Sequence, residues 1–159
     1  MFREMLRKKQ QLSQRECVDI LKTQLRGVLS VLGDDGWPYG VPLDHWYCEE
    51  DGCLYFHGGK TGHKVDAMRR HEKVSFCVCD EGVPDEEVPW ALVINSVVVF
   101  GRAEMLEDHD RTMEVSRQLS YKFTDDEGYI QREIQRSGPG TLCFRLIPEH
   151  MTGKRVVEK

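Results

Sequence analysis

The chain contains no C-x-x-C pair, no long apolar run and no excess of basic residues. The missing pair excludes zinc-ribbon and thioredoxin motifs, and no run approaches the roughly 20 residues that a membrane helix needs. The net charge of -5 disfavours a general nucleic-acid binder. The first ten residues lack the apolar segment of a secretory signal, so we expect a cytoplasmic protein whose six cysteines are reduced.

The composition is that of one globular domain. The 159 residues are 40% hydrophobic and 31% charged, and we expect a single domain over residues 1–159. Residues 1–26 hold seven Lys and Arg against three Asp and Glu, and we expect them to form a basic, helical N-terminal arm. Such an arm could contact a polyanion, although charged helix starts commonly serve solubility. Residues 150–159 are expected to be a C-terminal tail.

Periodicity and turn signals predict a mainly β, α+β fold. Ser13 to Glu16 form a capping box that opens a helix ending before Gly27. Two turns ending in Asp-Gly separate strands expected at 27–32, 39–47 and 53–57. Further strands are expected at 74–79, 91–105 and 142–146, and further helices up to residue 70, after Asp108, and at 125–136. These elements predict a six-stranded antiparallel barrel with flanking helices.

One proline lies inside a predicted strand. Pro42 has no N–H to donate to a ladder, so we expect it at a sheet edge, at a bulge or beside something other than a strand. Gly101, inside the long strand 91–105, is a candidate bulge.

The most unusual segment is a glycine-rich corner between the third strand and the next helix, with the sequence YFHGGKTGHK from Tyr55 to Lys64. Glycines let backbone N–H groups approach phosphate oxygens, and a helix N-terminus adds partial positive charge. The corner is not a Walker A loop, because Leu54 stands where that motif needs its first glycine. From the residues alone, a phosphate site and an ordinary glycine corner are equally good interpretations.

Other catalytic and metal-binding motifs are weak. Three histidines and two cysteines lie within 23 residues, but their spacings match no zinc signature, so we expect no metal site. These residues are His57, His63, His71, Cys77 and Cys79. No G-x-S-x-G elbow surrounds a serine, and no motif marks a nucleophilic cysteine.

Four segments in order carry a family resemblance. They are GVLS from Gly27, PYGVPL from Pro38, YFHG from Tyr55 with GHK from Gly62, and SVVVFGRAE from Ser96. Over residues 1–155 the chain resembles the pyridoxamine 5'-phosphate oxidase-like FMN-binding split-barrel superfamily, most of all the flavin-nucleotide-binding branch that includes the nitroimidazole-resistance (Nim) proteins. The resemblance implies a six-stranded split barrel that forms a homodimer with two FMN molecules at its interface.

The resemblance also implies a set of cofactor-binding residues. The second strand would contact the flavin ring, the end of the third strand would lie beside it, and the corner would hold the phosphate. The residues are Val41, Pro42, Leu43, His57, Gly58, Thr61, Gly62, His63, Lys64 and Ser96. His63 stands where the oxidase itself has arginine, and a histidine is a weaker, pH-dependent cation.

The activity expected from the resemblance is that of an FMN-dependent oxidoreductase. Electrons would pass from NAD(P)H through FMN to a small acceptor such as a nitroaromatic compound. His57 would be the catalytic residue beside the flavin; a packed core or merely cleft-lining histidine is the rival interpretation. Oxidation of pyridoxamine phosphate is not expected, because the oxidase's substrate-binding arginine and histidine pattern near the C-terminus is missing. The alternatives are a non-catalytic flavin- or haem-binding protein, with His57 as an axial ligand, and a plain interaction module.

Overall fold

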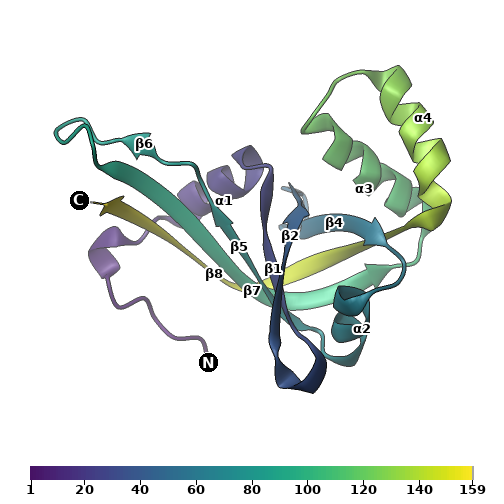
Figure 1. Cartoon of the computed structure of the whole chain (residues 1–159), viewed down its shortest axis with the longest axis horizontal. Coiled ribbons are helices and arrows are strands. Elements are labelled where there is room, and N and C mark those ends of the chain that lie inside the picture. The colour runs from purple at the N-terminus through teal and green to yellow at the C-terminus, as the bar shows by residue number, and fades with distance from the viewer. Residues whose placement is uncertain (159) are drawn as a thin grey trace.

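The structure is a computed structural model that describes residues 1–158, in which a curved antiparallel sheet is flanked by helices (Figure 1). The strands are β1 (Arg26–Leu32), β2 (Pro38–Asp44), β3 (Trp46–Tyr47), β4 (Leu54–Gly59), β5 (Lys73–Cys79), β6 (Val83–Pro84), β7 (Leu92–Leu106) and β8 (Thr141–Glu158). The α-helices are α1 (Gln14–Thr23), α2 (His63–Arg70), α3 (His109–Tyr121) and α4 (Glu127–Ser137), with short 3-10 turns η1 (Lys8–Gln10), η2 (Asp34–Gly36) and η3 (Gly138–Gly140).

The two strands at the ends of the sheet are separated in sequence by a single buried residue. Its strand order is β2-β1-β5-β7-β8-β4-β3, so β2 and β3 lie at opposite ends of the path. Only His45 separates them along the chain, and its side chain is fully buried. The predicted strand 39–47 is therefore divided into a part that pairs with β1 and a part that pairs with β4. The expected split barrel is confirmed.

The strand count and the C-terminal strand differ from the expectation. The sheet has eight strands over residues 1–158, because β3 and β6 are additional two-residue strands. The predicted strand 142–146 continues as β8 to Glu158, paired with β7 along most of its length. Residues 150–158 are thus part of the sheet, and residue 159 of the expected tail lies outside the described part.

Local sequence signals explain where several elements begin. Ser13 accepts a hydrogen bond from the N–H of Glu16, and the Glu16 carboxylate accepts one from the Ser13 N–H, which is the capping box expected for α1. Asp108 caps α3 as expected. Pro42 lies on β2, an edge strand that pairs only with β1, so no second ladder requires its missing N–H. The helix expected to start at Asp125 starts instead after Asp126, which caps α4.

The barrel interior is filled by alternating side chains of the central strands. Phe56 of β4 lies between Phe76 and Phe144, with ring centroids 5.0 Å away from it in both cases. A second buried cluster, which includes Tyr55 and Leu119, lies between β4 and α3. Because side chains alternate along β4, its inward residues fill the barrel while Tyr55 and His57 face the helices.

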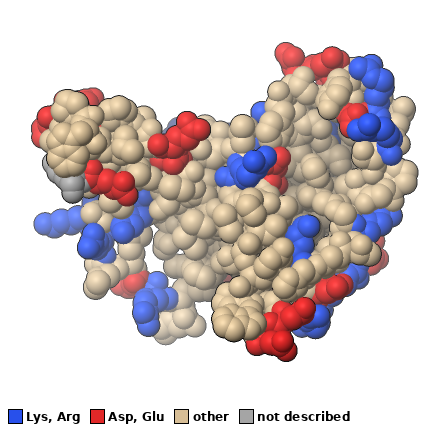
Figure 2. All heavy atoms as spheres, in the orientation of Figure 1, with Lys and Arg blue, Asp and Glu red and all other residues tan. Residues whose placement is uncertain are grey.

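The surface carries both signs of charge. Figure 2 shows basic side chains around the N-terminal segment at lower left and both signs interspersed elsewhere on this face. Of the expected helical arm over residues 1–26, only η1 and α1 are helical. Within residues 1–158, no helix combines the length and the apolar character needed to cross a membrane.

Candidate functional site

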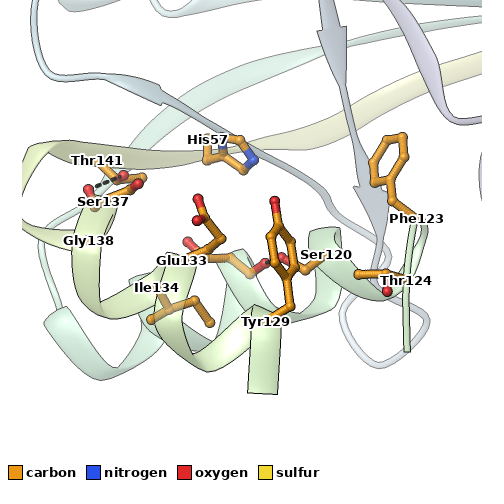
Figure 3. A pocket seen from close by; sticks show the side chains of 11 residues that line it. His57, Ser120, Phe123, Thr124, Tyr129, Glu133, Ile134, Ser137, Gly138 and Thr141 are labelled. Carbon is orange, nitrogen blue, oxygen red and sulfur yellow. Dashed lines mark hydrogen bonds between the residues drawn. The ribbon is translucent and has the colours of Figure 1, made fainter. Parts of the chain in front are cut away.

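His57 lies between two hollows at the end of β4. The first is a cavity of about 310 Å³ between β4 and the α3–α4 pair. Figure 3 shows the side chains of Glu133 and Tyr129 rising from α4 toward the His57 imidazole. The second hollow, of about 330 Å³, is lined by His57 together with Pro42, Leu43 and other residues of β1 and β2. His57 therefore connects the two hollows.

The environment of His57 favours the neutral form of its imidazole. Its side chain is exposed to water rather than packed in the core, so the interpretation as a core residue is wrong. The surrounding protein atoms nevertheless desolvate the ring, and this burial lowers the pKa of His57, partly opposed by the charge of Asp44. A neutral imidazole has one donor and one acceptor nitrogen available to a ligand.

Two of the three expected ring-contacting residues line the second hollow. Pro42 and Leu43 are at its wall. Val41 is partly buried and packs against the barrel core.

Charged groups near this hollow were not identified from the sequence. Arg26 and Asp44 form an ion pair of 2.7 Å at its wall. Close by, Lys122 donates hydrogen bonds to the carbonyl oxygens of Gln24 and His45 at 2.7 and 2.6 Å. Burial lowers the pKa of Lys122 to about 8, with Asp44 opposing the shift. These residues belong to no motif, and the fold alone brings them together.

The glycine-rich corner brings the end of β4 against the first turn of α2. Gly62 has a φ of 131°, a conformation open mainly to glycine, and supplies no side-chain cap to the helix that follows. The first N–H groups of α2 thus have no capping side chain. The Lys64 side chain reaches back over β4. Its Nζ lies 3.3 Å from the position that a Cβ on Gly58 would take. The corner joins a helix start and an ammonium group at one place, which suits an anion.

His63 is held at the corner by the β1–β2 hairpin. Its ring stacks on Tyr39 with centroids 4.2 Å apart. The backbone N–H of Asp34 donates to Nε2 at 3.3 Å, which leaves Nδ1 as the nitrogen available to a phosphate. Thr61 is exposed in the same corner.

Ser96 is the one expected site residue that the structure places elsewhere. It lies on β7 opposite Cys79 and Lys154. His57 pairs with Cys143, which pairs with Leu106 at the far end of β7. Ser96 and Leu106 are ten residues apart on β7, so within one chain Ser96 does not lie beside His57.

Within residues 1–158, no three His, Cys, Asp or Glu side chains are grouped so that they could hold a metal ion. All six cysteines are free, and Cys77 and Cys79 are exposed on one face of β5.

Comparisons with known proteins agree with this fold. A family model described as pyridoxamine 5'-phosphate oxidase matches residues 13–155. No curated protein sequence matches the chain.

Several solved structures are similar. A FAD-binding protein from Mesorhizobium loti is 26% identical, with a TM-score of 0.69 over 92% of this chain and 96% of that one. A candidate 5-nitroimidazole antibiotic resistance protein from Bacteroides thetaiotaomicron is 17% identical, with a TM-score of 0.76 over 93% and 87%. A FAD- and haem-binding protein from Mycobacterium smegmatis is 18% identical, with a TM-score of 0.72 over 91% and 72%.

Proposed function

Because the chain belongs to the pyridoxamine 5'-phosphate oxidase family, we propose that it binds FMN and transfers electrons from NAD(P)H to a small acceptor such as a nitroaromatic compound. The observation that carries the proposal is the arrangement around the end of β4. There the glycine-rich corner of Gly58, Gly62 and Lys64, which suits a phosphate, directly follows His57. His57 in turn lines both hollows.

The residues present fit a flavin mononucleotide. The uncapped start of α2 and the ammonium group of Lys64 suit its phosphate. The hollow lined by Pro42 and Leu43 suits the edge of its ring system. When bound, the flavin supplies the hydride chemistry, while the protein binds, orients and tunes it.

His57 has a defined part in this proposal. As a neutral imidazole at the rim of both hollows, it can hold one hydrogen bond to the flavin or to an acceptor without adding charge to the site. The flavin and the acceptor would then occupy separate hollows on either side of the His57 imidazole.

A second copy of the chain would complete the site. The outer face of the β2-β1-β5-β7 part of the sheet carries Pro42, Val28, Cys77 and Val98 in one cross-strand row, and Ser96 lies on the same face. Val28 is 41% exposed. We propose that a two-fold partner covers this face and contributes its own Ser96 to the cleft.

The similar structures support a second candidate. Relatives from two genera are described as FAD-binding, and one of these also binds haem. A non-catalytic flavin- or haem-binding protein would use the same hollows, with His57 as the haem ligand.

The absorbance spectrum of the purified protein, followed by mass measurement of the ligand released by mild denaturation, tests the proposal. We expect flavin absorption bands and the mass of FMN. The mass of FAD would show that the cofactor is FAD instead, and a Soret band would favour haem. Steady-state oxidation of NAD(P)H with a nitroaromatic acceptor then separates an oxidoreductase from a binding protein. A flavin-free protein that fails to take up FMN would refute the proposal.

A further inference from the structure

Two hydroxyl groups in the lining of the cavity between β4 and the α3–α4 pair present acceptor oxygens to a ligand. The hydroxyl group of Ser120 donates to the carbonyl oxygen of Ser116 at 2.8 Å, and that of Thr141 donates to the carbonyl oxygen of Ser137 at 2.8 Å. Both hydroxyl protons are therefore used within the protein. Their oxygen lone pairs stay available to a ligand that brings donors of its own.

The charge in this cavity is negative. Among the described residues that line it, Glu133 is the only one with a formal charge, and none is Lys or Arg. Arg136 contacts Glu133 Oε2 at 2.6 Å. The Arg136 side chain is 74% exposed, so water screens this pair, and Glu133 Oε1 accepts no hydrogen bond from residues 1–158. Lys122 is not in the lining and donates two hydrogen bonds, to the carbonyl oxygens of Gln24 and His45.

The remaining walls are aromatic and aliphatic. Phe123 and Tyr129 are about half exposed at the cavity, and Ile134 is buried beneath them. A volume of about 310 Å³ is at the small end for ligand pockets and suits a single-ring molecule. Figure 3 shows the Glu133 carboxylate and the Tyr129 hydroxyl pointing toward His57 across this space.

We propose that this cavity binds the electron acceptor and that Glu133 determines its class: uncharged or cationic aromatic molecules that carry hydrogen-bond donors, to the exclusion of carboxylates and phosphates. This inference rests on the proposed function for the identification of the ligand as an acceptor. The selectivity follows from the lining itself, because an anion would meet the Glu133 carboxylate, and none of the described residues that line the cavity is Lys or Arg.

Three probes with the same ring and nitro group test the selectivity: para-nitrobenzylamine, para-nitrobenzyl alcohol and para-nitrobenzoate. Ligand-observed NMR titration of the purified protein measures the dissociation constant of each probe, without turnover. We expect the amine to bind about tenfold more tightly than the benzoate, since a partly exposed charge contributes severalfold in each direction, with the alcohol between them. Equal affinity for amine and benzoate, tighter binding of benzoate, or no binding of any probe overturns the inference.

Glu133→Gln removes the charge and retains a similar shape. It should weaken the amine and strengthen the benzoate severalfold each, and leave the alcohol within about twofold. Glu86→Gln, in the exposed loop before β7, is the matched control and should leave all three affinities unchanged. A Glu133→Gln variant that alters the three probes equally would mean a structural role for Glu133 and would refute the proposal.

The same experiment separates this inference from the proposed function. Binding is measured both with FMN added and without it, and reduction of each probe by NAD(P)H is measured separately. Charge-selective binding without flavin uptake would contradict the proposed function but support the selectivity of the cavity. Flavin uptake and probe reduction without charge selectivity would support the function and refute the inference.

Discussion

The ammonium group of Lys64 lies over the backbone of Gly58, where a Cβ would come within 3.3 Å of Nζ and 3.4 Å of Cε. The Lys64 side chain, from the first turn of α2, thus lies against the end of β4. Lys64→Ala removes one charge-assisted hydrogen bond to the FMN phosphate, worth about 1.5–3 kcal/mol. We therefore expect FMN to bind roughly 10- to 150-fold more weakly in a fluorescence-quenching titration.

Riboflavin is the control for this prediction. It lacks the phosphate and should bind wild type and Lys64→Ala about equally. Lys73→Ala, an exposed lysine at the start of β5, should bind FMN as wild type does. If Lys64→Ala weakens riboflavin as much as FMN, Lys64 has a structural role and the phosphate lies elsewhere.

His57→Ala should change the flavin and leave the fold intact. The side chain is exposed at the rim of both hollows, so its loss should change the free energy of unfolding by less than about 0.5 kcal/mol. We expect a shifted flavin spectrum or slower reduction by NAD(P)H, measured by stopped-flow absorbance. His71→Ala, an exposed histidine after α2, is the matched control. An unchanged spectrum and rate would remove His57 from the list of functional residues.

Elements with local chemical signals were predictable from the sequence. The capping box at Ser13 and the cap at Asp108 lie where expected, because each depends on residues within one helical turn. The edge position of Pro42 and the bulge at Gly101 also follow from single-residue chemistry. The order of strands and helices was therefore largely readable before the sheet pairing was known.

Features that depend on distant partners were not predictable. β8 continues past Ile147 because β7 pairs with it, although its own sequence has no simple alternation there. Gly153 is a residue type depleted in strands, yet it lies within β8, where a Cβ would come within 3.0 Å of Leu12. Lys122 and Glu133 reach the hollows only through the packing of α3 and α4, and no local motif marks either residue.

The burial of His45 should make the protein sensitive to acid. His45 Nε2 is 2.7 Å from the carbonyl oxygen of Leu21, and Nδ1 has no hydrogen-bond partner among residues 1–158. Burial, with the charge of Lys122, lowers the pKa of His45 from 6.5 to about 4. Between these values the unfolded chain binds a proton that the folded protein excludes, so stability is lost as the pH falls from 6.5 toward 4. The loss from this group reaches about 3 kcal/mol at the acid end.

Urea unfolding at a series of pH values measures this loss. His45→Gln cannot titrate, so the free energy of unfolding should depend less steeply on pH over the same range. The remaining slope comes from His57 and the paired carboxylates. A variant with the same slope as wild type would show that His45 is not the group responsible.

Gly101 should tolerate no side chain. The β7–β8 register shifts between Phe100 and Gly101, where Phe100 pairs with His150 and Gly101 pairs with Pro148. A Cβ at this bulge would overlap the carbonyl oxygen of Ile147 and come within 2.6 Å of Leu146 Cδ2. Because backbone and core atoms on β8 would have to move, we expect Gly101→Ala to lower the free energy of unfolding by about 1–3 kcal/mol. Gly140→Ala is the matched control, since nothing lies within 4 Å of its Cβ position, and it should be neutral or slightly stabilising. Urea unfolding of the two variants decides the matter: equal midpoints would mean that β7 and β8 do not pack at the bulge as described.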